Sequence, residues 1–178
     1  MSLQLENLDT TTRPFMLSEV AHDIASNALY ISNRLNPNGR TLWPELLRQA
    51  IEHHDIQWLA DALRSRACMA STEQRRKPSG GFTDAAVPVT APDTLAEGEF
   101  NRFYIRGLCQ RVLQQGSGSL VVYRAKEVSS PRAESQALIG TAIDAQKTLT
   151  DLREHPGIDT ALGLPPGPNS GLSVRLTA

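Results

Sequence analysis

The chain has 178 residues, of which 40% are hydrophobic and only 5% aromatic, and its formal net charge is −1. This length fits one domain, or a small and a medium one, and the composition excludes a disordered chain because it supplies enough aliphatic residues for a core. A net charge near zero argues against a general electrostatic hold on nucleic acid or on an anionic membrane, although a local basic patch is compatible with it.

The sequence shows no signal for export or membrane insertion. The first residues lack a basic segment followed by an apolar run, and no stretch approaches the roughly 20 apolar residues of a membrane span. Cys68 and Cys109 have no CxxC partner and are expected to be buried free thiols. We therefore expect a cytoplasmic protein with no membrane partner, and we predict no cofactor.

The first 69 residues predict an arm followed by three helices. Residues 1–14 are polar and end in Arg-Pro, which favours an extended arm. Apolar residues then recur at spacings of three and four, which predicts amphipathic helices joined by short turns. We interpret residues 15–69 as one helical unit, with helices expected over residues 17–29, 41–54 and from 56 onwards.

Helix start signals precede the second and third of these helices. Thr41 is a candidate cap with Pro44 in the first turn, and Asp55 is a candidate cap for the third helix. Trp43 and Trp58 are the largest apolar side chains of the unit, and we expect them to help pack it.

Residues 70–94 differ in character from the segments around them. They are rich in proline, contain two adjacent glycines and carry the basic triplet Arg75-Arg76-Lys77. This composition predicts a linker, which is either a flexible tether or a segment laid across a partner.

The stretch from residue 99 to residue 128 is expected to organise the second unit. It predicts a long helix, a Gly-Ser-Gly turn at residues 116–118 and a strand over residues 120–128. The helix has a wide apolar face, and helical spacing places a polar stripe on the opposite side. That stripe consists of Arg102, Arg106 and Gln110.

The rest of the chain predicts a small sheet with one further helix. Residues 133–143 fit either a second strand or a short helix, residues 145–154 a helix, and residues 172–176 a terminal strand. Residues 95–178 therefore form a predicted α+β unit. The fold class predicted for the whole chain is α+β, with an N-terminal three-helix unit followed by a long central helix and a short sheet.

Basic residues of the second unit are the best candidates for a binding site. If they converge on one face, they can hold phosphates or an acidic partner. The simpler alternative is a solvated surface in which nearby carboxylates, including Glu99 and Glu127, neutralise them. The candidate binding residues are Arg102, Arg106, Arg124, Lys126 and Arg132.

Two histidine patterns raise the question of catalysis. His22-Asp23 and His54-Asp55 fit the order of ligands in a helical phosphohydrolase, and Arg48 and His53 have an R-x4-H spacing used by some ribonucleases. Both patterns have ordinary explanations, since Asp55 is a helix cap and histidines are favoured at helix C-termini. We therefore predict no catalytic and no metal-binding residue.

The sequence thus favours a non-enzymatic interaction or assembly subunit of a bacterial or phage-type complex. Its contact surfaces are expected to be the arm, the linker and the arginine-bearing helix face, in a homo- or hetero-oligomer. One alternative is an enzyme acting on phosphodiesters or nucleotides, of the phosphohydrolase or ribonuclease-like kind. Another is a nucleic-acid-binding protein.

Overall fold

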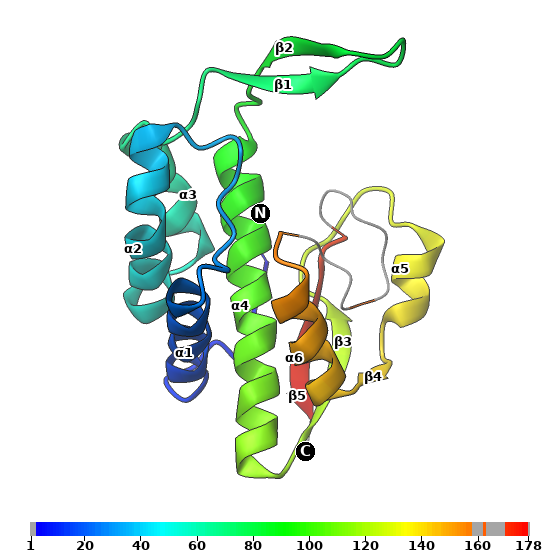
Figure 1. Ribbon diagram of the computed structural model, residues 1–178. Helices are drawn as coiled ribbons and strands as arrows, with labels where there is room; N and C mark the ends of the chain where they lie inside the picture. Colours follow the sequence, from blue (N-terminus) through cyan, green and yellow to red (C-terminus); the bar gives the residue numbers. More distant parts are fainter. Residues whose placement is uncertain (1–2, 158–161, 163–169, 178) are drawn as a thin grey trace.

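The computed structural model describes residues 3–157, 162 and 170–177 (Figure 1). Within these residues the chain forms six helices and two antiparallel sheets, which confirms the predicted α+β class. The elements in chain order are α1 (Thr12–Ala25), α2 (Pro37–His53), α3 (Ile56–Ser65), β1 (Thr72–Arg76), β2 (Phe82–Ala86), α4 (Ala91–Gln115), β3 (Ser119–Arg124), α5 (Ala133–Leu138), β4 (Ala142–Ile143), α6 (Ala145–Glu154) and β5 (Leu172–Thr177).

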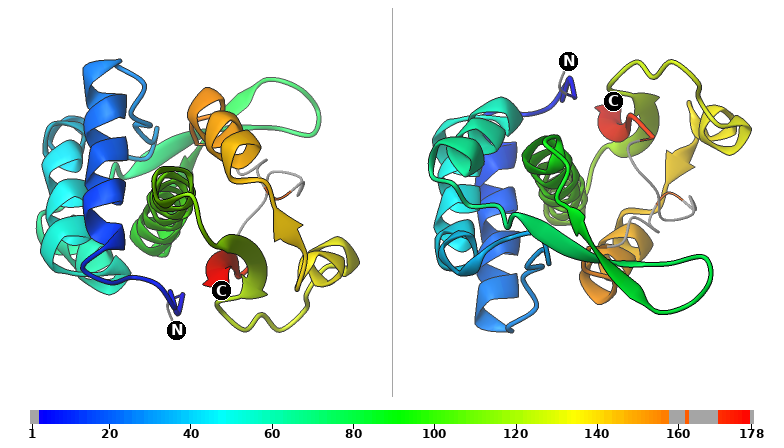
Figure 2. Two further views of the ribbon diagram at one scale, coloured as in Figure 1. Left: turned by 90° about the horizontal axis from the view of Figure 1, so that it is seen from below. Right: turned by 90° about the horizontal axis from the view of Figure 1, so that it is seen from above.

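Helix α4 is the centre of the molecule. Helices α1, α2 and α3 lie on one side of it, and α6 with the sheet β4-β3-β5 lies on the other (Figures 1 and 2). Every residue from Phe100 to Cys109 is buried, so the helix is covered all round over this stretch. A single hydrophobic core therefore runs from the N-terminal helices through α4 into the sheet.

The N-terminal helices begin earlier than the sequence signals indicate. Thr12 begins α1, where Asp9 Oδ1 accepts a hydrogen bond from its backbone N–H at 2.7 Å, and Pro14 lies in the first turn. Asn36 caps α2 through the N–H of Gly39, so Pro44 lies inside the helix and Thr41 is not the cap. The predictions for these two starts were wrong. In α2 the Asn36 cap takes the role assigned to Thr41, and in α1 the carboxylate of Asp9 accepts from the first N–H group of the helix.

Other expectations for this region are confirmed. Asp55 caps α3 by accepting a hydrogen bond from the N–H of Trp58 at 2.8 Å. Trp43 is fully buried and donates its indole N–H to the carbonyl of Tyr30, whereas Trp58 is half-buried and stacks on His54. Cys68 and Cys109 are buried free thiols.

The predicted linker over residues 70–94 has regular structure. Strands β1 and β2 pair in register from Thr72↔Ala86 to Arg76↔Phe82, and residues 91–94 form the first turn of α4. Gly80 and Gly81, both with positive φ, close the hairpin. The sequence did not reveal these strands because they have no apolar face: Glu73 and Ala85 are half-buried, and the other residues of both strands are exposed.

The predicted extended arm is held against its own chain. Gln4 N–H donates to the carbonyl of Ala125 at 2.8 Å, and the hydroxyl groups of Tyr104 and Tyr123 accept from backbone N–H groups of the arm. Glu6 forms an ion pair with Arg175 on β5. The arm therefore covers α4 and the sheet.

The C-terminal elements largely match their predicted positions. Helix α6 has the predicted bounds, and β5 extends the predicted strand by one residue. Residues 133–143 contain both alternatives, because α5 is followed by β4, which pairs with β3. Strand β3 ends at Arg124, earlier than predicted, because the next two N–H groups donate to the carbonyl of Gly171. No helix among the described residues is both long and apolar enough to cross a membrane.

Two glycines of α4 give a matched test of this packing. A Cβ at Gly107 would lie 2.6 Å from Met16 Cγ and 3.0 Å from its backbone N, whereas a Cβ at Gly98 would meet nothing within 4 Å. We expect Gly107→Ala to lower the free energy of unfolding by about 1–3 kcal/mol. Gly98→Ala should raise it by up to about 1 kcal/mol through helix propensity. Chemical denaturation checks both, and equal effects would contradict the close contact of α1 with α4.

Candidate functional site

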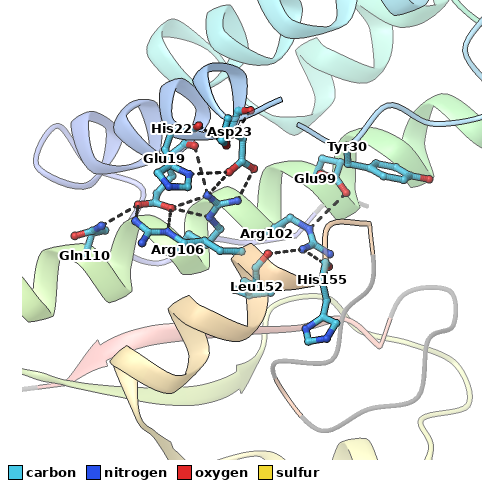
Figure 3. A network of polar contacts seen from close by, with 12 residues as sticks. Glu19, His22, Asp23, Tyr30, Glu99, Arg102, Arg106, Gln110, Leu152 and His155 are labelled. Atoms are coloured by element: carbon cyan, nitrogen blue, oxygen red, sulfur yellow. Dashed lines mark hydrogen bonds and ion pairs between the residues drawn. The ribbon is translucent and has the colours of Figure 1, made fainter. Parts of the chain in front are cut away.

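A buried ion-pair network joins α1 to α4 (Figure 3). Arg106 is 1% exposed and donates from Nε to Glu19 Oε2 at 2.8 Å. Its Nη1 and Nη2 donate to the two oxygens of Asp23, each at 2.7 Å. This bidentate geometry is the strongest form of an arginine–carboxylate contact.

The same network extends to α6 through Glu19. Arg153 on α6 donates to both oxygens of Glu19, at 2.9 and 2.6 Å, and Gln110 donates to Oε1 at 2.9 Å. Burial by itself would raise the pKa of Glu19, but Arg153 and Arg106 outweigh it and hold the pKa below its ordinary value. Glu19 is therefore an ionised carboxylate shared by two arginines, and it fastens three helices together.

Arg102 lies one helical turn before Arg106 and contacts the end of α6. Its Nη1 donates to the carbonyl groups of Leu152 and His155, at 3.0 and 2.9 Å. Its Nε lies 3.6 Å from Glu99 Oε1, an ion-pair distance that is too long for a hydrogen bond. A cation at a helix C-terminus is favoured by the helix dipole, so Arg102 stabilises the end of α6.

The prediction that Arg102 and Arg106 lie on an exposed polar stripe was wrong. Both are buried, because α1 and α6 cover the side of α4 that carries them. Charged residues on that side are matched by acceptors from the two covering helices. Helical spacing alone cannot show that a second and a third element pack there.

The other three candidate residues lie apart from this pair. Arg124 donates to the carbonyl of Ser170 at 2.9 Å and to Gln136 Oε1 at 3.1 Å. Lys126 binds both oxygens of Glu97, at 2.7 and 3.0 Å. Arg132 is exposed and precedes α5. The five residues thus share no single exposed face, and three of them have carboxylate partners.

The histidine patterns do not come together as a metal site. His22 contacts Asp23, which Arg106 already binds, and His54 stacks on Trp58. No group of three or more His, Cys, Asp or Glu side chains in the described part of the chain is placed to hold a metal ion. Arg48 pairs with carboxylates one turn away on both sides of it.

A pocket of about 600 Å³ opens beside Arg102. It lies between the first half of α4, the loop before α2, the end of α6 and the start of β5. Polar and charged groups alternate with apolar side chains around it, as in many small-molecule sites. The residues that matter most for its chemistry are Tyr30, Arg34, Glu73, Glu97, Glu99 and Arg102.

Glu99 is the unusual group of this pocket. It is 5% exposed, and its Oε2 is a buried oxygen without a hydrogen-bond partner. Burial raises the pKa of Glu99 to about 7, although Arg102 and Arg106 act in the opposite direction. A carboxyl group that is partly protonated near neutral pH is typical of functional sites.

The sequence did not single out Glu99 except as a neighbour that neutralises arginines. One signal was present: Glu97, Glu99 and Arg102 surround Phe100 and precede Phe103, so charged residues lie on several sides of an apolar helix. A helix that must be buried all round and still carries charges places those charges inside.

Comparison with known protein families, curated proteins and solved structures finds no significant match for this chain. The function is therefore inferred from the geometry and chemistry of the residues described above.

The buried network predicts a large effect of Arg106. We expect Arg106→Met to lower the free energy of unfolding by about 3–5 kcal/mol, because it leaves Glu19 and Asp23 buried without their main partner. Arg48→Met removes an exposed arginine with two carboxylate partners and should cost far less. Chemical denaturation of both variants checks this, and a small loss for Arg106→Met would contradict the stabilising role of the network.

Glu99 predicts a specific pH dependence of stability. Its pKa is about 7 in the folded chain and near the ordinary 4.5 when unfolded, so the folded state holds an extra proton between these values. Its contribution to stability is therefore complete below about pH 4.5 and is lost as the pH rises to about 7, at up to about 1.4 kcal/mol per pH unit. Glu99→Gln should lack this decline. Denaturation between pH 5 and about 8 checks it, and parallel curves for the two proteins would contradict the raised pKa.

Proposed function

We propose that this chain is a non-enzymatic assembly subunit and that the β1–β2 hairpin contacts a second copy of the chain. The observation that supports this is the projection of the hairpin from the end of the molecule, away from the helices and the larger sheet (Figure 1). Phe82 is 67% exposed and Val89, just before α4, is 89% exposed. Large apolar side chains at this exposure favour a protein contact.

The physics of a two-stranded sheet supports the same proposal. An isolated hairpin is at best marginally stable in water, because it has no hydrophobic face to bury. Among the residues that the structure describes, this sheet consists of β1 and β2, and no third strand covers the backbone groups at its two outer edges. A neighbouring subunit that covers Phe82 or extends the sheet would satisfy both needs.

The base of the hairpin is bound to the folded core. Arg34, in the loop before α2, donates from Nε to Glu73 Oε2 at 2.6 Å and from Nη2 to Oε1 at 3.2 Å. Helix α4 begins five residues after β2. The hairpin is therefore fixed to the folded core at one end and exposed at the other, as suits an arm that reaches a neighbour.

A second copy is the occupant we favour, because symmetric self-association is the commonest form of assembly. The expected setting, a cytoplasmic complex of bacterial or phage type, is part of this proposal. The proposal no longer includes the N-terminal arm and the arginine-bearing helix face as contact surfaces, because both pack against other parts of the same chain. The enzymatic alternatives have no comparable observation in their favour.

One observation favours nucleic acid as a second candidate. Arg75, Arg76 and Lys77 are exposed at the tip of β1 and in the following turn. A two-stranded ribbon fits the DNA major groove, where such residues contact phosphates. Binding that weakens steeply with salt would distinguish this function from self-association.

The molar mass in solution tests the proposal. We expect the wild-type chain to form an oligomer in light scattering coupled to size exclusion, and Phe82→Ser to shift it towards the monomer. The matched control is Ile24→Ser, which removes an apolar side chain that is 45% exposed on α1 and should leave the mass unchanged. A wild-type monomer over the whole accessible concentration range would overturn the proposed self-association, as would an oligomer insensitive to Phe82→Ser.

A further inference from the structure

The pocket beside α4 has no role in the proposed assembly and has the volume of a small-molecule site. Its volume of about 600 Å³ falls within the range of ligand pockets. Its walls combine apolar side chains, among them Leu95, Ile105 and Leu152, with three carboxylates. The state of these carboxylates indicates which ligand chemistry the pocket suits.

Two of the three carboxylates already have cationic partners. Glu73 accepts from Arg34 at 2.6 Å, and Glu97 accepts from Lys126 at 2.7 Å. Glu99 has Arg102 at 3.6 Å and an Oε2 that accepts no hydrogen bond. A buried acceptor left unsatisfied costs free energy, so a donor brought by a ligand would be stabilised there.

The cations of the pocket are directed elsewhere. Arg102 donates from Nη1 to two backbone carbonyls of the α6 end, and Arg34 donates to both oxygens of Glu73. The Nε of Arg102, a buried donor, faces Glu99 Oε1 at 3.6 Å, whereas Glu99 Oε2 accepts no hydrogen bond. This unsatisfied acceptor favours a ligand that donates over an anion that accepts.

An aromatic ring completes the pattern. Tyr30 lines the same pocket as Glu99, and both residues are labelled in Figure 3. The backbone at Gly157 packs closely on this ring, since a Cβ there would lie 2.5 Å from two ring atoms. An aromatic face and a carboxylate in the same pocket form a combination that attracts organic cations.

We propose that this pocket binds a small organic cation with a primary ammonium group on an apolar body. The ammonium group donates to the Glu99 carboxylate and lies against Tyr30. The apolar body packs on Leu95, Ile105 and Leu152. The class is set by the unsatisfied oxygen of Glu99, the ring of Tyr30 and the apolar wall together.

Binding of such a cation is linked to a proton. The charged groups that act on Glu99 are Arg102 and Arg106 on α4 and Asp23 on α1. The other charged or titratable residues that line its pocket are Tyr30 and Arg34 in the loop before α2, Glu73 on β1 and Glu97 on α4. With the pKa of Glu99 near 7, the cation displaces a proton from it at neutral pH. Alkyl ammonium groups stay charged there, as lysine does, so affinity rises between about pH 6 and 8.

The test is a titration followed by amide chemical shifts and by calorimetry. The probes are n-butylamine, 2-phenylethylamine and spermidine, with n-butanol and 2-phenylethanol as uncharged controls. We expect at least one amine to change the amide chemical shifts of residues that line the pocket and to release protons on binding. The alcohols should do neither. The absence of shifts for all three amines would overturn the proposal, as would equal shifts for the alcohols.

Variants separate recognition from folding. Glu99→Gln keeps the shape of the side chain and should weaken amine binding at least about tenfold. Tyr30→Leu should also weaken it, whereas Tyr30→Phe keeps the ring and should bind nearly as well as the wild type. Glu97→Gln is the control, because Glu97 lines the pocket but is paired with Lys126. The pH dependence of binding must disappear in Glu99→Gln, and its persistence there would contradict the role of Glu99.

Discussion

The structure depends on one buried charge, the guanidinium of Arg106. It lies in the middle of α4 with two carboxylates of α1 around it, and none of the three residues is more than 3% exposed. Breaking such a pair is costly because a desolvated charge remains, so the register of α1 on α4 is strongly specified. The next residue, Gly107, lets the backbone of α1 approach to contact. Arg106 thus fixes the register between the two helices and Gly107 allows their close approach.

From Arg106 back to Glu99, the charged side chains of α4 become less well compensated. Arg106 has two carboxylates, Arg102 has backbone carbonyls of α6, and Glu99 keeps an unsatisfied oxygen. Because Glu19 binds both Arg106 and Arg153, the same network also places α6 and with it one wall of the pocket. A rigid polar interior therefore supports a site whose own bonding is incomplete, which is the usual relation between scaffold and site.

The β1–β2 hairpin, unlike the interior around Arg106, is not held by buried side chains. It has regular backbone pairing but no core of its own, and its main described tie to the body is the ion pair of Glu73 with Arg34. These two residues also line the pocket, so the base of the hairpin and the pocket wall are the same structural element. The proposed assembly surface and the proposed ligand site are thus neighbours that rest on different features: exposed apolar side chains in one case and a buried carboxylate in the other.

Local patterns in the sequence determined the α+β class, the Asp55 cap, the bounds of α6 and the terminal strand, because capping and periodicity act over a few residues. They failed where the outcome depends on distant partners. The hairpin has no apolar alternation to reveal it, and the arm finds its hydrogen bonds on Tyr104 and Tyr123. Only the tertiary structure decided that Arg102 and Arg106 are interior and that Glu99 faces a pocket, because helices α1 and α6 bring their acceptors from positions far away in the chain.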